Sequence, residues 1–369
     1  MDERTIKLAQ NIVNYSIKVK KGERVLISSN GLTCLPLVKA VIKEVYKAGA
    51  VPYADLTDSS VTRELVLNST EQQWKFLAEV DMKKMEGMDA YVGIGGNANT
   101  AEMADVPAEK MDLYSRFYQR PVTDVRLKKK WVVLRYPNNS LAQSMGTSLE
   151  SFEDFFYKVC NLDYSKMSKA MDSLVDLMNK TDKVRLVAPN TDLTFSIKGI
   201  PAIKCAGEMN IPDGEVYTAP VKDSVNGRIT YNTPSPNRGF TFENVSLVFK
   251  DGKIVEATAN DNEKVNAIFS TDEGAKYVGE FAIGVNPYIT KPMKNILFDE
   301  KIRGSIHFTP GNAYDDADNG NRSALHWDLV LIMTKECGGG EIYFDDRLIR
   351  KDGVFVVPEL LCLNPENLV

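Results

Sequence analysis

A regular alternation of two hydrophobic patterns along the first half of the chain constrains its fold more than any other feature. Apolar residues recur with the 3.6-residue period of a helix at 3–19, 33–48, 60–68, 71–85, 148–160 and 164–180. Four short apolar runs are typical of buried strands. Those at 24–27 and 51–54 follow the first and second of these helical segments, and those at 90–94 and 131–135 follow the fourth. Strands separated by helices pair in parallel through right-handed crossovers. Residues 1–182 therefore predict an α/β domain with a mostly parallel sheet.

The pattern changes after residue 182. Strand-like runs follow one another at 184–187 and 193–197, and the runs at 245–249 and 254–255 flank Asp251-Gly252. An Asp-Gly pair between two apolar runs is a strong hairpin signal. Long helical periods become fewer, and glycine and proline become frequent. Residues 183–369 therefore predict a β-rich α+β domain.

Composition excludes several classes of protein. The chain has 369 residues, more than one hydrophobic core usually supports, and its formal charge of −5 gives no basic footprint for nucleic acid. No apolar stretch approaches the roughly 18 residues of a membrane helix, and the start Met1-Asp2-Glu3-Arg4 does not have the pattern of a signal peptide. The five cysteines are scattered and odd in number, which favours reduced thiols. We expect a cytoplasmic protein that binds neither nucleic acid nor membranes.

The chain contains only two histidines, and both lie in strand-like segments of the second half. His326 and Asp328 are two residues apart in an apolar run over 323–333, so on a strand they face the same side. Such a pair alone is more often a structural hydrogen bond than a metal site. His307, in a second strand-like segment, makes a metal site the stronger interpretation.

Two glutamates stand alone among small or apolar neighbours. Glu215 follows Gly214 and precedes Val216, and Glu280 lies between Gly279 and Phe281. Burying an ionised carboxylate is costly unless it is paired or bound to a metal. From the chemistry alone, a buried salt bridge or a turn acid remains an equal alternative to a metal ligand.

Four sequence blocks taken together resemble the M29 metallopeptidases, the family of aminopeptidase T, aminopeptidase S and PepS-type enzymes. The blocks are Gly-Glu-Val-Tyr-Thr-Ala-Pro at 214–220, Gly-Glu-Phe-Ala at 279–282, His-Phe-Thr-Pro-Gly-Asn-Ala-Tyr at 307–314 and His-Trp-Asp at 326–328. Their order matches the family, and so does the segment 136–143 that precedes a helix. The resemblance implies a homodimer that removes amino-terminal residues from peptides with a free N-terminus.

The resemblance also assigns site residues. It implies that two divalent ions (zinc, cobalt, manganese or magnesium) are held by Glu215, Glu280, His307, His326 and Asp328. It implies that Tyr314 is an active-site residue and that the domain over residues 183–369 is the metal-binding catalytic one. Five ligands exceed what one tetrahedral zinc with an open position needs, and they suit two ions that activate a bridging water. Glu215 or Glu280 is a candidate to relay a proton to the leaving amine.

Other functions were compatible with parts of the pattern. His-x-Asp is half of the facial triad of mononuclear iron oxygenases, but the second histidine expected downstream is absent after Asp328. A serine or cysteine hydrolase would need a nucleophile elbow, and no G-x-S-x-G motif is present. The glycines at 93–96 do not have dinucleotide-binding spacing. A non-peptidase metal-dependent amide hydrolase, or a catalytically silent metal- or peptide-binding protein on the same fold, remains the alternative.

Overall fold

The computed structural model describes residues 2–369, and the chain divides into two compact units. The first unit comprises the residues up to Asn161 together with Gly207–Pro212, and the second comprises Leu162–Ala206 and Asp213–Val369. Within residues 2–369, every helix is too short or too polar to cross a membrane.

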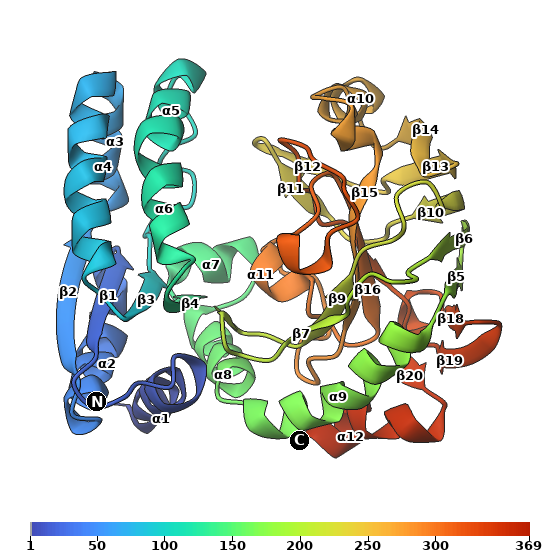
Figure 1. Cartoon of the computed structure of the whole chain (residues 1–369), viewed down its shortest axis with the longest axis horizontal. Helices are drawn as coiled ribbons and strands as arrows, with labels where there is room; N and C mark the ends of the chain where they lie inside the picture. The colour runs from blue at the N-terminus through green and yellow to red at the C-terminus, as the bar shows by residue number, and fades with distance from the viewer. Residues whose placement is uncertain (1) are drawn as a thin grey trace. The chain divides into compact units, whose positions relative to one another are not determined.

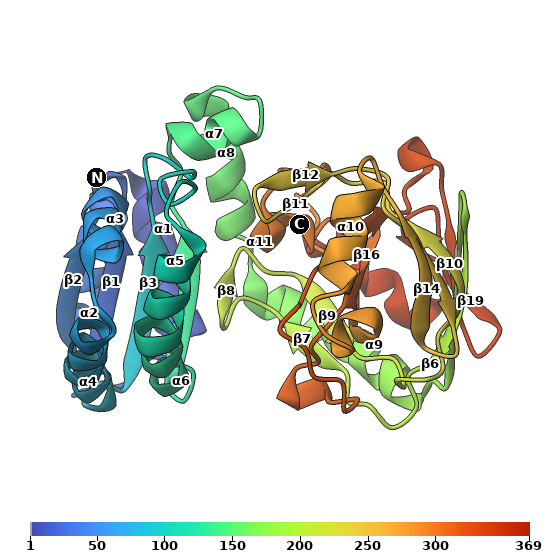
Figure 2. The ribbon, with the colours of Figure 1, turned by 90° about the horizontal axis from the view of Figure 1, so that it is seen from above.

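The first unit contains a five-stranded parallel sheet in the order β2-β1-β3-β4-β8. Figure 2 shows the blue strands β2, β1 and β3 in this order. Leu26 in β1 lies opposite Tyr53 on one side and Tyr91 on the other, which fixes the parallel register. The strands are β1 Arg24–Asn30, β2 Val51–Thr57, β3 Ala90–Gly95, β4 Lys130–Arg135 and β8 Asn210–Ile211.

Helices connect these strands, as the alternating pattern predicts. Several begin at a side chain that accepts a hydrogen bond from a backbone N–H of the first turn, for example Asp58, Thr70 and Ser148. Wider helical turns follow α1 at Ile12–Ser16 and join α5 to α6 at Ser115–Gln119. The helices of this unit are α1 Glu3–Asn11, α2 Leu35–Lys47, α3 Ser59–Asn68, α4 Glu71–Glu86, α5 Ala108–Tyr114, α6 Arg120–Arg126, α7 Asn139–Ser144 and α8 Leu149–Cys160.

The second unit is built on two larger antiparallel sheets and a small hairpin (Figure 1). The eight-stranded sheet has the order β14-β13-β10-β6-β5-β18-β19-β20: Lys253–Thr258, Ser246–Lys250, Asn226–Thr230, Thr191–Ser196, Lys183–Ala188, Glu341–Phe344, Arg347–Lys351 and Val354–Phe355. The five-stranded sheet has the order β17-β16-β15-β9-β7: Val330–Ile332, Ser305–Pro310, Val278–Gly284, Glu215–Thr218 and Ile203–Cys205. Strands β11 Ser235–Asn237 and β12 Phe240–Phe242 form the hairpin, and the helices are α9 Tyr164–Lys180, α10 Asn262–Phe269, α11 Ile296–Asp299 and α12 Pro365–Leu368.

Phenylalanine rings from both large sheets form the core of this unit. Phe195 of β6 lies with its ring centroid 5.0 Å from those of Phe281 in β15 and Phe308 in β16. Phe249 of β13 adds a perpendicular contact with Phe308. Every residue of β15 and β16 is buried, so these strands are covered on both faces. The face of β15 and β16 that carries Phe281 and Phe308 contributes to this core, and the opposite face carries Glu280 and His307.

The predicted fold class is confirmed, including the Asp-Gly hairpin. Asp251 and Gly252 both have positive φ angles, 48° and 80°, as a two-residue hairpin turn requires. The second compact unit begins at Leu162, whereas the sequence pattern predicts a boundary at residue 182. Helix α9 packs its buried face against β7 and the turn at 358–363, both in the second unit. An amphipathic pattern shows that a helix has a buried face but not which sheet that face covers.

Candidate metal centre

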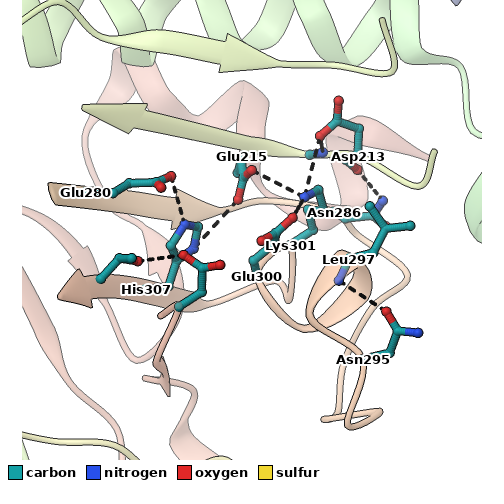
Figure 3. A network of polar contacts seen from close by, with 12 residues as sticks. Asp213, Glu215, Glu280, Asn286, Asn295, Leu297, Glu300, Lys301 and His307 are labelled. Carbon is teal, nitrogen blue, oxygen red and sulfur yellow. Dashed lines mark hydrogen bonds and ion pairs between the residues drawn. The ribbon is translucent and has the colours of Figure 1, made fainter. Parts of the chain in front are cut away.

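Three of the five predicted metal ligands come from adjacent strands of the five-stranded sheet. Glu215 opens β9, Glu280 lies in β15 and His307 lies in β16. In the antiparallel register Ala282 pairs with His307 and Gly284 pairs with Glu215. Side chains alternate along a strand, so positions 280, 282 and 284 share a face with their cross-strand partners. The three side chains therefore converge on one face, as Figure 3 shows.

His326 and Asp328 join this group, although not from a regular strand. The strand predicted over 323–333 is wrong in extent, because β17 covers only Val330–Ile332 and His326 makes an isolated bridge to Gly311. Between Leu325 and Leu329 the pairing with the end of β16 is irregular: Trp327 donates its N–H to the carbonyl of Pro310, and Phe308 donates its N–H to the carbonyl of Leu329. His326 Nε2 still lies 3.2 Å from Asp328 Oδ1. The prediction that these two side chains meet is consistent with the structure.

Glu280 lies between the two histidines. Its Oε1 is 3.1 Å from His307 Nε2, and its Oε2 is 3.3 Å from His326 Nε2. On the far side of the His307 ring, Nδ1 is 3.6 Å from Glu215 Oε2. Glu280, His307 and Asp328 each offer a ligand atom within 4.8 Å of the other two, close enough to surround one ion. Glu280 is therefore the carboxylate of this group that contacts both histidines.

Several donor atoms of this group are buried without a hydrogen bond. Within residues 2–369, Glu215 Oε2, His307 Nδ1 and His326 Nε2 have no hydrogen-bond partner. His326 Nδ1 lies 2.9 Å from the carbonyl oxygen of Asn312, to which it donates when it carries the proton. That tautomer leaves the lone pair of Nε2 free, as a metal-binding histidine requires. Unpartnered buried donors are costly, so this set of residues fits divalent metal ions.

The pKa values of His307, His326 and Asp328 show that the negative charge of this group stabilises bound cations, protons included. Burial acts against protonated histidine, but the carboxylate of Glu215 and the hydrogen bond with Glu280 outweigh it and raise the pKa of His307 to about 10. Burial is likewise outweighed at His326, where the charge of Asp328 raises the pKa to about 12. Burial alone would raise the pKa of Asp328, yet His326 holds it well below its usual range. Protons on the histidines would compete with metal ions for the same atoms.

A lysine that the sequence analysis missed neutralises part of this negative charge. The side chain of Lys301 is fully buried, and its Nζ lies 3.3 Å from Glu215 Oε1 and 4.0 Å from Asp213 Oδ1. It also pairs with Glu300 (Figure 3). Burial opposes the charged form, but the charge of Glu215 outweighs it and raises the pKa of Lys301. In the sequence, Asp299-Glu300-Lys301 has the composition of a solvated charged run, so composition gave no signal of burial.

Lys301 also contacts a second cluster of residues whose side chains are of metal-binding types. Cys205, Asp213 and Glu215 offer ligand atoms within 4.8 Å of one another. Lys301 already places an ammonium group beside both carboxylates of this cluster. Glu215 therefore directs one oxygen to Lys301 and leaves the other for the histidine side.

Tyr314, predicted to be an active-site residue, lies next to the centre. Its ring centroid is 4.7 Å from that of His326 and 5.7 Å from that of Tyr217. The residue is 47% exposed, and partial desolvation followed by the charges of the nearby carboxylates, Glu280 first among them, raises the pKa of Tyr314. The hydroxyl therefore stays protonated at neutral pH and can donate a hydrogen bond.

Relatives support the resemblance that the four blocks suggest. The family model described as thermophilic metalloprotease (M29) matches residues 1–353. Aminopeptidase PepS of Streptococcus thermophilus is 24% identical over 88% of this chain and 91% of its own length. Aminopeptidase 2 of Geobacillus stearothermophilus is 23% identical over 94% of each chain.

Two solved structures share the fold. AmpT of Thermus thermophilus superposes with a TM-score of 0.81 at 20% identity, over 96% of this chain and 99% of its own. The 2,5-dihydroxypyridine dioxygenase of Pseudomonas putida KT2440 gives a TM-score of 0.63 at 13% identity, over 97% and 98%. These two likenesses concern the fold alone, which therefore occurs in proteins named for different chemistries. The family match spans nearly the whole sequence, and on that ground the chain belongs to the M29 family of metalloproteases.

Proposed function

We propose that the chain is an aminopeptidase that binds two divalent ions and removes amino-terminal residues from peptides. The observation that carries this proposal is the convergence of Glu215, Glu280, His307, His326 and Asp328, with three of their buried nitrogen and oxygen atoms left without a hydrogen bond. Together with Asp328 Oδ1, these three atoms form two pairs, Glu215 Oε2 with His307 Nδ1 and His326 Nε2 with Asp328 Oδ1, and Glu280 lies between the two histidines. Each pair would hold one ion.

The charge of the centre also favours two ions. Asp213, Glu215, Glu280, Glu300 and Asp328 are buried or nearly buried carboxylates, and Lys301 supplies one positive charge against them. Burial raises the pKa of Glu215 to about 8 and also raises that of Glu300, so both carboxylates ionise fully only when cations offset their charge. With all five acids ionised and both histidines neutral, four negative charges remain. Two divalent cations would balance them, whereas one would leave an uncompensated charge in a low-dielectric site.

Bound here, divalent ions would polarise the scissile carbonyl and lower the pKa of a water molecule to about 7. The chain's own residues then have defined tasks. Glu280 and Asp328 hold His326 between them, and Thr309 donates a hydrogen bond of 2.8 Å to Asp328 Oδ1. The protonated hydroxyl of Tyr314 would donate to the oxygen on which negative charge develops.

Proton transfer to the leaving amine needs a carboxylate. The sequence pointed to Glu215 or Glu280, but both are proposed ligands. Glu300 lies beside the centre, outside the proposed ligand set, and its charge interacts with those of Asp328 and His307. We therefore add Glu300 to the candidates for proton transfer. The resemblance further implies a homodimer, and the composition and scattered cysteines indicate a cytoplasmic protein; both remain predictions.

Hydrolysis of amino-acid anilides and dipeptides by the purified protein tests the proposal. We expect release from free amino termini but not from acetylated ones, lost on chelation and restored by zinc, cobalt, manganese or magnesium. Glu280→Ala and His326→Ala should each lower activity at least about 100-fold. Loss of a residue that only hydrogen-bonds to a metal ligand already lowers activity about 10–100-fold, and loss of the ligand itself should cost more. Glu256→Ala, an exposed acid on β14, is the matched control. Full activity with unchanged metal content in either ligand variant would overturn the assignment.

A dioxygenase is the second candidate, because a protein of that name shares the fold and the centre contains two histidines beside carboxylates, the ligand types of a mononuclear iron site. Oxygen uptake with iron(II) and 2,5-dihydroxypyridine, without peptide hydrolysis, would favour it. Hydrolysis of simple amides without a free amino terminus would indicate a non-peptidase amide hydrolase. Metal or peptide binding without turnover would indicate a catalytically silent binding protein.

A further inference from the structure

A cavity of about 330 Å³ lies beside the proposed metal centre. His326 and Asp328 line one part of it, the segment 233–237, which includes β11, lines another, and Lys294, Ile296 and Asp299 line a third. All these residues belong to the second unit. The volume is that of a site for a small ligand, at the lower end of the usual range.

Among the residues that line this cavity, Lys294 is the one lysine. Its side chain is exposed, and it forms no ion pair with any residue of the chain between positions 2 and 369. The other walls include the apolar side chains of Pro234, Pro236 and Ile296. A cation without a counter-charge at an apolar cavity is complementary to an anionic group of a ligand.

The turn that carries Lys294 is held in an unusual conformation. Lys294 has a φ angle of 55°, in the left-handed region that residues with a Cβ rarely adopt. The buried carboxylate of Asp299 accepts hydrogen bonds from the N–H groups on both sides, Met293 at 2.6 Å and Asn295 at 3.2 Å. Asn295 in turn accepts from Leu297 at 3.2 Å (Figure 3). Backbone strain that the surroundings hold in place is concentrated at functional positions.

The negative groups of the cavity do not cancel this lysine. Asp299 directs both carboxylate oxygens to backbone N–H groups of the turn. Asp328 is engaged by Thr309 and His326 at the metal-centre end. Lys294 is therefore the group of the cavity available to an incoming anion.

We propose that this cavity is a subsite for a carboxylate of the substrate, bound by Lys294 while the scissile amide lies at the end marked by His326 and Asp328. The inference rests on the proposed peptidase function and narrows its substrates to short peptides that carry a carboxylate near the scissile bond. Two sources have this chemistry: the α-carboxylate of a dipeptide, and the side chain of an acidic residue after the cleaved bond.

Steady-state kinetics with three substrates separates the two sources. Alanyl-alanine carries only an α-carboxylate, alanyl-alaninamide carries none, and alanyl-glutamic α-amide carries only a side-chain carboxylate. Lys294→Ala should raise KM about tenfold for the substrate whose carboxylate is recognised and change kcat little, because a charged hydrogen bond is lost without altering the metal centre. The amide without a carboxylate should be unaffected. Lys294→Arg should retain most of the recognition.

Lys291→Ala is the matched control, since Lys291 is an exposed lysine three residues earlier that does not line the cavity. Equal effects of Lys294→Ala on all three substrates, or none on any, would overturn the subsite. Calorimetric binding of alanyl-alanine and alanyl-alaninamide, with the zinc-loaded and the chelated protein, needs no turnover. Carboxylate-dependent binding that Lys294→Ala abolishes, in a protein without hydrolysis, would reject the proposed function and keep the subsite. Absence of such binding in both metal states would reject the subsite.

Discussion

Asp299 is the residue at which burial has the clearest thermodynamic consequence. Burial raises its pKa to about 7, even though the N–H groups of Met293 and Asn295 stabilise the charged form. In an unfolded chain the same group titrates near pH 3.9. Between about pH 4 and 7 the folded state therefore binds a proton that the unfolded state has released. The contribution of Asp299 to the free energy of unfolding must fall as pH rises through this window.

We expect Asp299→Asn to remove this pH dependence. Its free energy of unfolding, relative to that of the unmodified chain, should increase with pH between about 4 and 7, by at most about 1.4 kcal/mol per pH unit. Urea unfolding of the chelated protein at several pH values measures the difference. Asp346→Asn, at an exposed turn, is the control. Parallel pH profiles of Asp299→Asn and the unmodified chain would contradict the prediction.

The residues of the centre were unequally predictable. His307, His326 and Asp328 were identifiable because histidine is rare in this chain and the i, i+2 spacing is local. Glu215 and Glu280 needed the resemblance, because an isolated glutamate is equally a salt-bridge residue. Lys301 and Glu300 were missed, since their burial depends on how the segment after α11 packs under β9 and β15. No property of the three charged residues 299–301 carries that information.

At the scale of the element, the turn between β16 and His326 depends on a glycine. Gly311 has a φ angle of 113°, and a Cβ there would lie 2.1 Å from the carbonyl oxygen of Leu325. It also makes the bridge to His326. The close approach of these two backbones is what brings His326 to Glu280, which comes from a different strand.

Gly311→Ala should therefore displace His326 and weaken metal binding by about 10–100-fold, the range seen when support of a ligand is lost. Metal titration of the chelated protein measures the affinity. Gly320→Ala is a matched control, because Gly320 also has a positive φ of 79° but nothing lies within 4 Å of the added Cβ. Similar metal affinity in both variants would show that the contact with Leu325 does not position His326.

Periodicity predicted elements well where they were long and regular. The expected strands of the first half correspond to β1–β4, and the helices at 33–48, 60–68 and 71–85 correspond to α2, α3 and α4. Strand β8 was not predicted, because Asn210–Ile211 contributes only two residues and joins the parallel sheet from a distant part of the chain. Such pairing is long-range, and a two-residue segment carries no hydrophobic period.

At the scale of the whole molecule, all five proposed ligands belong to the second unit. The tryptophans are distributed unequally: Trp74 and Trp131 lie in the first unit and Trp327 lies in the second. Trp327 is buried against Phe242 and Phe269, and its Nε1–H donates to Ser235 at 2.8 Å. It also lies between the two proposed ligands His326 and Asp328, so its fluorescence reports unfolding of the unit that binds metal.

We expect chelation to lower the thermal midpoint reported by Trp327, in a chain carrying Trp74→Phe and Trp131→Phe. Metal at 100 times its dissociation constant stabilises the folded state by about 2.7 kcal/mol, which corresponds to about 5–10 °C for a unit of this size. The shift should disappear when Glu280→Ala is added, because chelator then has no bound metal to remove. A chelator shift of equal size with and without Glu280→Ala would mean that the ions stabilising this unit bind elsewhere than at the centre formed by β9, β15 and β16.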